Sequence, residues 1–596
     1  MKKQFLYILT STFILASCGG GGGGGSIEFP SNPIVPPTTV NLSAEPTLIL
    51  VDETATLSWS STNATSCSAN WTEKTTSSGS EVITVGSTGI NSFSISCTGP
   101  GGTTQATVDI EVHIFNECMD DEIAVSNINE LNESMTLSSG SGRDDVIYLK
   151  DGIYLFDDVI VYDAQGTTEN LILKGCFEGN SNIVFDGQNK SRIFEFQKNG
   201  PSSVDNDPTH AQPPFPSLEI YDVTFTGARW DSIDTSGSCW SVNGMGCGSA
   251  IYADRYHLKL HNVSFIDNEA TSGTSGGHLV NNIVNLEISD SEFNNNTANG
   301  SFHAGIIRFA GDLNISNTRF INNTGGYSLH AGIHAYVNCH KRTIKDSLFE
   351  SNHYAYYSLI WDCGSEDKSE IQQEIINSDF IDNKYAFVIR GTNVNIINSR
   401  FIGNYLGYGN YNEGMCDNDL NGTFDGTQIT GHDMNCITGA AIMFDKYMYD
   451  WSVLNIQDST FSNNSARDFG GAIDMLGSVR CDESDYFRYA CEDVSDEPYY
   501  DLIINNSTFS GNESHRGAAI SIAKRGPQKG NVLIENSTFT QNIATVPDGY
   551  EQNVEDIETS VLVVGGDAEI SNTTFSDNEA DFVIQVKGSL SCDNSC

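Results

Sequence analysis

The stretch Leu313–Asn323, LNISNTRFINN, decides the fold of this chain. Leu313 and Ile315 are two residues apart, which is the spacing of side chains on one face of a β-strand. Asn317 can adopt a left-handed backbone conformation and so bend the chain after that strand. Phe320 then returns to the interior, and the last Asn closes a second turn. The stretch therefore predicts two short strands that meet at a corner.

Eleven phenylalanines share this register. Ile or Leu stands five residues before each of them, and Asp or Asn stands three residues before each. Asn stands three residues after ten of the eleven, and only Ala228 departs. The phenylalanines are Phe225, Phe265, Phe293, Phe320, Phe349, Phe380, Phe401, Phe461, Phe509, Phe539 and Phe575. A register kept this regularly predicts a repeat protein.

The spacing of the repeats selects the architecture. Successive repeats are most often 27 to 31 residues apart, which suits one coil of a parallel β-helix with its loops. Identical residues one coil apart stack, so we expect a column of phenylalanines and a hydrogen-bonded ladder of asparagines. Leucine-rich repeats and propeller blades need other spacings. The sequence predicts an all-β chain in which residues 118–596 form a right-handed parallel β-helix of about 13 coils.

A second element follows the Asn, as in Gly470-Gly471-Ala472-Ile473. The F-x-x-N and G-G-A-I elements together resemble the repeats of the chlamydial polymorphic outer-membrane proteins, and that resemblance implies a β-helical, adhesive passenger. The chain stops at Cys596 without the membrane domain of that family, so we expect a lipid as its anchor. The runs Val146–Tyr154, Leu171–Gly175 and Ile183–Gly187 resemble the opening coils of pectate-lyase-like β-helices.

The N-terminus has the features of a targeting segment. Lys2 and Lys3 precede a short apolar run, and Leu15-Ala16-Ser17-Cys18 resembles the lipobox of bacterial lipoproteins. The resemblance implies that residues 1–17 are a signal peptide and that Cys18 is the lipid attachment site. Residues 18–38, rich in Gly and Pro, would be a tether. The expected location is the cell outer membrane, facing the surface or the periplasm.

Residues 39–115 alternate between short strands and Ser/Thr/Gly turns, which predicts a small sandwich. The run Thr56–Cys67, TLSWSSTNATSC, resembles bacterial immunoglobulin-like modules. Such modules serve as stalks and, in some cases, as sugar binders. We expect a stalk here, with Trp59, Cys67 and Cys97 in its core.

The chain holds fifteen cysteines. Fourteen remain beside Cys18, an even number that predicts disulfides formed outside the cytoplasm. Pairing neighbours in sequence gives Cys67/Cys97, Cys118/Cys176, Cys239/Cys247, Cys339/Cys363, Cys416/Cys436, Cys481/Cys491 and Cys592/Cys596. The sequence alone leaves this connectivity open.

The charge is strongly acidic, with 77 acidic against 30 basic residues and a net charge of −47 at pH 7. A surface of this kind repels nucleic acid and anionic membranes and attracts cations. Nucleic acid is therefore excluded as an expected partner. The plain alternative is that the acidity only keeps an exported protein soluble.

Two inserts interrupt the repeat, near residues 405–438 and 477–500. The first contains a D-x-D-x-N-G-x-x-D run whose oxygen ligands follow the spacing of a calcium loop. The predicted ligands are Asp417, Asp419, Asn421, Asp425 and the Thr423 carbonyl, with calcium in a structural role. Gln428 stands where an EF-hand has Glu, and a solvated acidic loop is the alternative.

His303 and His330 each follow a repeat Asn by seven residues, with His278 and His334 nearby. On adjacent coils they would stack, either as a polar ladder at a bend or as a site for a transition metal or acid–base chemistry. The ladder is the expected outcome.

Catalytic signatures of β-helix enzymes are missing from the sequence. No R-x-P-x-x-R run of the pectate-lyase type and no G-H-G or R-x-K of the polygalacturonase type occurs. We therefore expect a lipid-anchored display, adhesion or ligand-binding protein without catalytic residues, whose ligand is a glycan or a surface protein. The alternative is a lyase or hydrolase that acts on polysaccharide along a lateral face of the β-helix.

Overall fold

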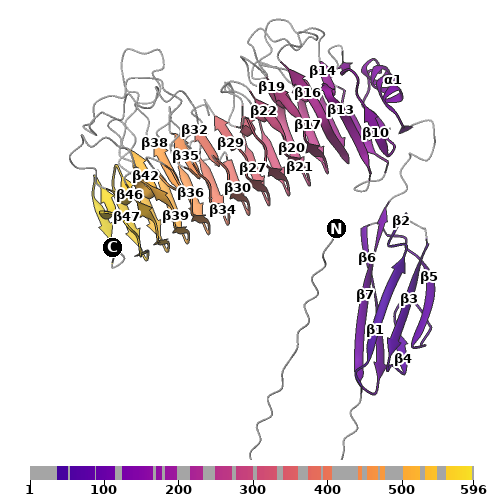
Figure 1. Cartoon of the computed structure of the whole chain (residues 1–596). Coiled ribbons are helices and arrows are strands. Elements are labelled where there is room, and N and C mark those ends of the chain that lie inside the picture. The colour runs from indigo at the N-terminus through magenta and orange to yellow at the C-terminus, as the bar shows by residue number, and fades with distance from the viewer. Residues whose placement is uncertain are drawn as a thin grey trace, which may run out of the picture. The chain divides into compact units, whose positions relative to one another are not determined.

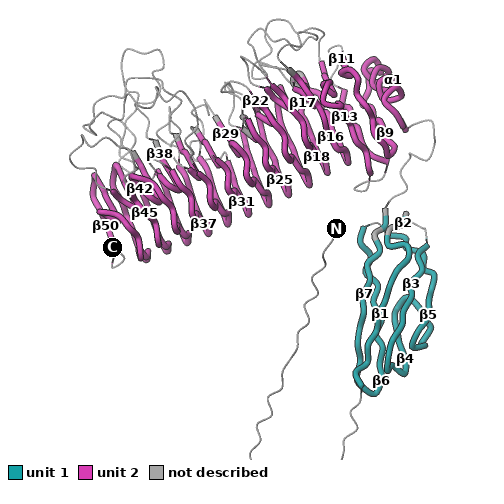
Figure 2. The backbone as a smooth tube through the Cα atoms, viewed as in Figure 1, with its two compact units in different colours: residues 1–115 teal, residues 116–596 magenta. Residues whose placement is uncertain are grey.

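The computed structural model of the chain divides into two compact units, residues 1–115 and 116–596 (Figure 2). The structure describes residues 36–50, 54–87, 89–113, 124–164, 169–176, 181–197, 215–231, 248–271, 277–299, 305–325, 327–331, 340–359, 373–384, 386–390, 393–405, 440–445, 453–466, 470–476, 501–523, 531–545 and 559–593. In these ranges no helix is long and apolar enough to cross a membrane.

The first unit is built from two sheets. One has the order β1 (Thr39–Glu45), β3 (Thr54–Thr62), β5 (Ser78–Thr84), and the other has the order β2 (Leu48–Leu50), β7 (Gly102–His113), β6 (Gly89–Gly99), β4 (Ser66–Ser68). All pairs are antiparallel except β2 with β7. Alternate side chains of the strands point into one core, as the period of two predicts.

The core of this unit contains Trp59 and a disulfide between Cys67 and Cys97, with an S–S distance of 2.04 Å. The indole Nε1 of Trp59 donates to the Thr76 carbonyl at 2.9 Å, which satisfies its buried N–H. Gly79 is required opposite the ring, because a Cβ there would lie 2.6 Å from Trp59. The disulfide and the packed indole therefore stabilise the centre of the small sandwich.

The second unit is a stack of coils, each with three strands, which we call rows 1, 2 and 3 in chain order (Figure 1). Row 1 carries the Leu-x-Ile pairs: β9 (Asp145–Leu149), β12 (Leu171–Gly175), β15 (Ser217–Tyr221), the second halves of β17 (Gly248–His261) and β20 (His278–Ser289), β24 (Leu313–Ser316), β27 (Arg342–Lys345), β30 (Gln373–Ile376), β33 (Val394–Ile397), β36 (Leu454–Gln457), β39 (Leu502–Asn505), β43 (Val532–Glu535), β47 (Ala568–Ser571) and β50 (Leu590–Cys592). The two-residue strand β8 (Ala124–Val125) pairs with β9.

Row 2 carries the repeat phenylalanines. Its thirteen described strands are β10 (Gly152–Leu155), β13 (Ile183–Ser191), β16 (Val223–Asp231), β18 (Ser264–Ile266), β21 (Glu292–Asn294), β25 (Arg319–Ile321), β28 (Leu348–Glu350), β31 (Asp379–Ile381), β34 (Arg400–Ile402), β37 (Thr460–Ser462), β40 (Thr508–Ser510), β44 (Thr538–Thr540) and β48 (Thr574–Ser576). Short strands extend some coils beyond row 2: β19 (Glu269–Thr271), β22 (Thr297–Asn299), β41 (Glu513–Ser514) and β45 (Ile543–Ala544).

Row 3 closes each coil. It contains β11 (Ile160–Asp163), β14 (Phe194–Gln197), the first halves of β17 and β20, β23 (Gly305–Phe309), β26 (Tyr327–Ala331), β29 (Tyr354–Leu359), β32 (Phe387–Arg390), β35 (Ile442–Asp445), β38 (Ile473–Leu476), β42 (Arg516–Ala523), β46 (Ser560–Val564) and β49 (Phe582–Val586). Every strand of the three rows pairs in parallel with its neighbours on the next coils. The predicted fold class, a right-handed parallel β-helix after a small sandwich, is confirmed.

The predicted columns are present inside the stack. The rings of Phe225 and Phe265 lie 4.6 Å apart and nearly parallel, and the same stacking continues to Phe575. The amide of Asn296 donates to Asn323 Oδ1 at 3.0 Å and to the Phe265 carbonyl at 2.8 Å. This ladder runs from Asn268 to Asn578 and satisfies each buried amide.

The backbone conformation at the first corner is as expected, and the conformation at the second corner is not. The Asx three residues before each Phe has a positive φ, 45° at Asn317, as predicted. At the second corner, however, the left-handed residue is the one before the repeat Asn, such as Asn322 with φ 53°. The repeat Asn itself stays buried and holds that turn through its side chain. Its role is therefore to fasten the second corner, while its neighbour bends the chain.

One helix, α1 (Ile128–Ser139), covers the first coil and is not expected from the repeat. Asn127 is its N-cap, and its side chain accepts from the backbone N–H groups of Asn129 and Glu130. Leu131 and Met135 are one turn apart and fully buried in the solenoid core. The helix therefore closes the N-terminal end of the stack, where the core would otherwise meet water.

Candidate binding face

The longest interruptions of the coils lie next to row 3. The connections that lead into or out of row 3 include the longest in the unit, with 39 residues between β34 and β35 and 25 residues between β38 and β39. The corner between rows 1 and 2, by contrast, is commonly two residues long, as between β24 and β25. In repeat proteins, insertions gathered on one face often mark the binding face. The predicted inserts near 405–438 and 477–500 both lead into or out of row 3, and their residues lie outside the described ranges.

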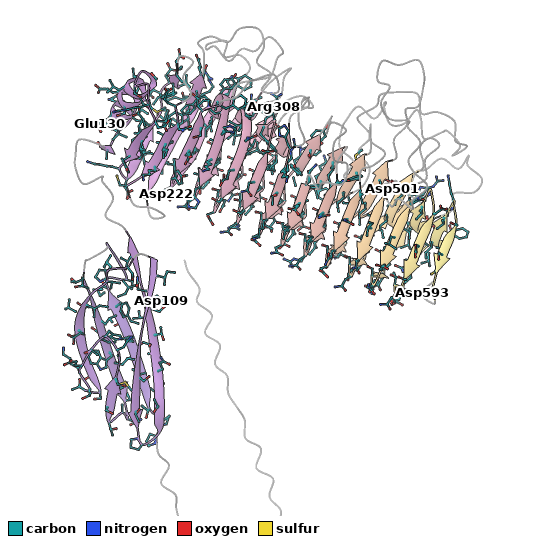
Figure 3. The ribbon with its side chains drawn as sticks, turned by 180° about the vertical axis from the view of Figure 1, so that it is seen from behind. Asp109, Glu130, Asp222, Arg308, Asp501 and Asp593 are labelled. Carbon is teal, nitrogen blue, oxygen red and sulfur yellow. A yellow bond between two sulfur atoms is a disulfide. The ribbon has the colours of Figure 1, made fainter. Side chains whose placement is uncertain are left out.

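The strand register aligns the outward side chains of row 3 in a single line, which we call face 3. On β14, Phe194 and Phe196 point into the core, so Glu195 between them points out. The same backbone position on successive coils is Val161, Glu195, Tyr252, Asn281, Arg308, His330, Tyr357, Val388, Met443, Asp474, Ser521, Val563 and Gln585. Figure 3 shows Arg308 on the side of the stack opposite Asp222, which lies at the corner of rows 1 and 2.

Outward side chains on a bare sheet are exposed, as Val161 is at the first position of face 3, where it is 46 % exposed. On face 3 most are not: Glu195 and Asn281 are 1 % exposed, and Arg308 is 8 % exposed. Polar groups that point away from a core and are still buried need partners or a ligand. After its first coil, most outward side chains of face 3 are therefore covered rather than exposed to solvent.

Near its N-terminal end, face 3 combines aromatic and planar polar side chains. Trp230 and Tyr252 pack on each other as a cluster separate from the solenoid core. Glu195, one coil from Tyr252, is paired with Arg192 at 2.9 Å and accepts from Gln197 at 2.5 Å. We call Arg192, Glu195, Trp230, Tyr252 and Asn281 the aromatic end of face 3. Its ion pair holds the carboxylate in a fixed orientation.

The middle of face 3 is different. Val388 and Met443 form an apolar cluster with Tyr357 against it. Asp474 follows on the next coil and is 1 % exposed. Beyond the aromatic end, face 3 therefore passes through an apolar stretch to a single carboxylate at Asp474.

The predicted calcium ligands, Asp417, Asp419, Asn421, Thr423 and Asp425, lie outside the described residues, as does the lipid site Cys18. Within the described ranges, no group of three His, Cys, Asp or Glu side chains could hold a metal ion. Cys176 and Cys592 are each disulfide-bonded. The other predicted disulfide residues outside the sandwich are not among the described residues; they are Cys118, Cys239, Cys247, Cys339, Cys363, Cys416, Cys436, Cys481, Cys491 and Cys596.

The predicted histidine row is only partly placed. His303 and His334 lie outside the described residues. His278 is buried, its Nδ1 is 3.1 Å from the Gly305 carbonyl, and it pairs with Gly305 rather than with the position of His330. His330 aligns with Arg308 instead. His278 and His330 therefore belong to different columns and do not form one site.

One arrangement on row 1 superficially resembles a catalytic triad. His261 Nδ1 lies 2.7 Å from Ser289 Oγ and 3.4 Å from Asp290 Oδ2. A triad needs the serine on one ring nitrogen and the carboxylate on the other, so that the histidine can pass a proton between oxygen atoms while it is held in place. Here both partners face the same nitrogen. The group is a surface hydrogen-bond cluster.

The face 3 residues were missed by sequence reasoning, which looked for recurring residues. Their signal is positional: each stands between two inward residues of a row 3 strand.

No family model matches the chain, and no curated protein matches it.

Two solved structures are similar. The catalytic domain of Agl-KA is 11 % identical, with coverage of 84 % of this chain and 74 % of that chain and a TM-score of 0.32. A mutant tailspike protein of E. coli bacteriophage HK620 in complex with pentasaccharide is also 11 % identical, with coverage of 78 % and 74 % and a TM-score of 0.31. Likeness at this level carries no argument about function, and the fold assignment rests on the strand pairing described above.

Proposed function

We propose that this protein is a non-catalytic carbohydrate-binding protein of the bacterial surface, which holds a polysaccharide along face 3. The observation that carries the proposal is the aromatic end of face 3, where Trp230 and Tyr252 lie beside the oriented carboxylate of Glu195. Face 3 belongs to row 3, which the longest connections between strands enter or leave.

The chemistry of this end suits sugars. The C–H face of a pyranose packs against the electron-rich face of an aromatic ring, and its hydroxyls bond to planar side chains such as carboxylate, amide and guanidinium. Glu195, Asn281 and Arg308 supply all three planar groups on nearby coils. A repeating chain of sugars can also follow a line of side chains that repeats from coil to coil. A glycan therefore fits this face better than a globular protein does.

The large distance between the carboxylates on face 3 favours binding over hydrolysis. Glu195 and Asp474 are the carboxylates on face 3 whose side chains the structure describes, and they are eight coils apart. At about 4.8 Å per coil this is about 38 Å, whereas paired carboxylates in glycoside hydrolysis stand about 5 to 10 Å apart. A lyase or hydrolase on this face remains the second candidate, and it requires residues from the inserts.

The test is binding to a glycan array, followed by calorimetry with the best ligand. We expect Trp230→Ala and Tyr252→Ala each to weaken binding by about tenfold or more, because aromatic anchors dominate such interfaces. Tyr221→Ala is the matched control, since Tyr221 points outward from row 1 on another side. Equal affinity of all three variants and the parent would reject the site, and new reducing or unsaturated sugar ends would reject the non-catalytic function.

Anchoring and calcium are separate parts of the proposal. Cys18 would carry the lipid, and Cys18→Ser should then leave the membrane fraction; retention of that variant on membranes would contradict the anchor. Calcium would bind Asp417, Asp419, Asn421, Thr423 and Asp425. A chelator should then lower the melting temperature and speed proteolysis of that insert, and no change in either would count against the metal.

A further inference from the structure

A second unusual feature lies inside the stack, away from face 3. The inward column of row 1 is aliphatic on either side of one point, with Leu313 before it and Val394 after it. Between them stand Arg342 and Gln373, on two successive coils and only 2 % and 1 % exposed. Charged side chains are almost never buried to this degree unless they are paired. The position is therefore an exception that needs an explanation.

Within the described part of the chain, the hydrogen-bond partners of the Arg342 guanidinium are all neutral. Its Nε and Nη2 donate to the carbonyls of Gly311 and Ala310 at 3.3 Å each, and Nη1 donates to Ser358 Oγ at 2.5 Å. The group also lies over the ring of Phe309, 5.4 Å from its centroid. These three contacts and the Tyr356 hydroxyl use at most four of the five guanidinium N–H groups, so at least one is left over, and no carboxylate among the described residues contacts the group.

The nearest acidic influence comes from outside the core. Asp312 is more than half exposed, and its carboxylate accepts from the Lys341 backbone N–H at 2.9 Å and lies 3.2 Å from His340 Nδ1. Burial lowers the pKa of Arg342, and the interactions with Tyr356 and Asp312 oppose that change only in part. Asp312 also binds His340 and the Lys341 backbone at the surface, so it compensates the buried cation only in part.

Gln373 adds a second unused donor next to the first. Its Oε1 accepts from the Tyr356 hydroxyl at 3.2 Å, while its buried Nε2 has no partner. Tyr356 is also in hydrogen-bond contact with Arg342, so the three side chains form one group. The small inward residue Ser358 on row 3 leaves room beside the long arginine, where the next coil has Ile389. The group has surplus donors and a full positive charge, and the residues that the structure describes offer it no direct anionic acceptor.

We propose that Arg342 and Gln373 bind a small inorganic anion of the halide class inside the β-helix. An anion supplies what the described side chains lack: negative charge for the guanidinium and an acceptor for the unused N–H groups of both residues. A water molecule would accept hydrogen bonds but leave the charge uncompensated. The site lies in the solenoid core and is independent of glycan binding on face 3.

The test compares chloride with gluconate at constant ionic strength. Chloride should raise the urea midpoint of the full chain in a saturable way, because it binds the folded state. Arg342→Leu, which restores the aliphatic column, should abolish the chloride response. Arg319→Leu, which removes the same charge from a half-exposed position on row 2, should keep it. Gln373→Leu should raise the half-saturating chloride concentration about tenfold.

A crystallographic arm covers the case in which Arg342→Leu fails to fold. Crystals of the unmodified protein grown in bromide should show an anomalous peak between Arg342 and Gln373. A water molecule or empty density at that point would overturn the proposal. So would equal midpoints of the parent in chloride and gluconate, or an unchanged chloride response in Arg342→Leu.

Discussion

At the scale of single residues, the corner between rows 1 and 2 shows how a stack of identical turns avoids repulsion. All eleven corner residues are Asp or Asn with positive φ. No two Asp residues stand on successive coils, and each Asp has an Asn after it: Asp222, Asn262, Asp290, Asn317, Asp346, Asn377, Asn398, Asp458, Asn506, Asn536, Asn572. The amide of Asn317 donates to Asp290 at 2.6 Å, and Asn377 donates to Asp346 at 3.0 Å. The sequence of Asp and Asn along the stack therefore keeps carboxylates apart, in addition to supplying residues that tolerate a positive φ.

This order predicts a difference between two chemically identical substitutions. Asn317→Asp would place a carboxylate between Asp290 and Asp346, about 4.8 Å from each, and should lower the free energy of unfolding at pH 7 by about 1–2 kcal/mol. Asn536→Asp is the matched control, because its corner neighbours Asn506 and Asn572 are amides and Asn572 already donates to it. Urea unfolding of both variants measures the difference.

The same pair gives a pH dependence with a definite sign. Two neighbouring carboxylates raise the pKa of the acid introduced by Asn317→Asp, so the folded state takes up its proton more readily than the unfolded chain does. The destabilisation is therefore full at pH 7 and disappears as the pH falls through that raised pKa. A penalty equal in the two variants, or one that grows on acidification, would contradict the electrostatic explanation.

At the scale of elements, each row is fastened by a ladder of its own. Besides the Phe column and the Asn ladder, a buried Ser or Thr follows nine of the eleven corner Asx residues. These hydroxyls accept from backbone N–H groups of the previous coil, as Ser378 does from Ser347 at 3.2 Å. A third ladder lies between rows 3 and 1, where Asn531 accepts from the Asp567 backbone N–H at 3.0 Å. Cross-coil side-chain bonds thus hold every corner in register.

The buried amide ladder should be the costliest to break. Asn352→Ala removes the acceptor of both the backbone and side-chain N–H of Asn323, at 3.1 and 2.9 Å, and the donor to the Phe320 carbonyl. Buried groups left without partners should lower the free energy of unfolding by about 3 kcal/mol. Asn314→Ala, on an exposed position of β24, should cost less than about 0.5 kcal/mol. Similar losses for the two variants would mean that the ladder adds little.

The elements also show what sequence reasoning can reach. The Phe column, the corner Asx and the Asn ladder were predictable because the same residue type returns on every coil. The helix α1 occurs once and has no repeat to reveal it. Face 3 changes its residue from coil to coil, and lining up Val388 with Met443 requires the register across an insert between Phe401 and Phe461. Arg342 was passed over because a single cation between aliphatic positions gives no pattern.

At the scale of the whole molecule, acidity is the dominant physical property, with 47 more negative than positive charges. Coils are about 4.8 Å apart, so carboxylates on different coils interact unless ions screen them. The screening length is about 30 Å at 0.01 M salt, which spans about six coils, and about 3 Å at 1 M, which is less than one. Self-repulsion along the stack should therefore depend strongly on salt.

We accordingly expect the urea midpoint to rise steadily as potassium gluconate is raised from 0.01 to 1 M at pH 7. Gluconate is chosen so that this general effect stays separate from any specific response to halide at Arg342. The control is the same series near pH 4.3, the sequence pI, where net repulsion has largely gone and the slope should be much smaller. Equal slopes at the two pH values would show that the salt acts through preferential exclusion from the protein surface, since that effect does not need net charge. A slope confined to pH 7 would show that the acidic surface lowers the stability of the folded chain through its net charge.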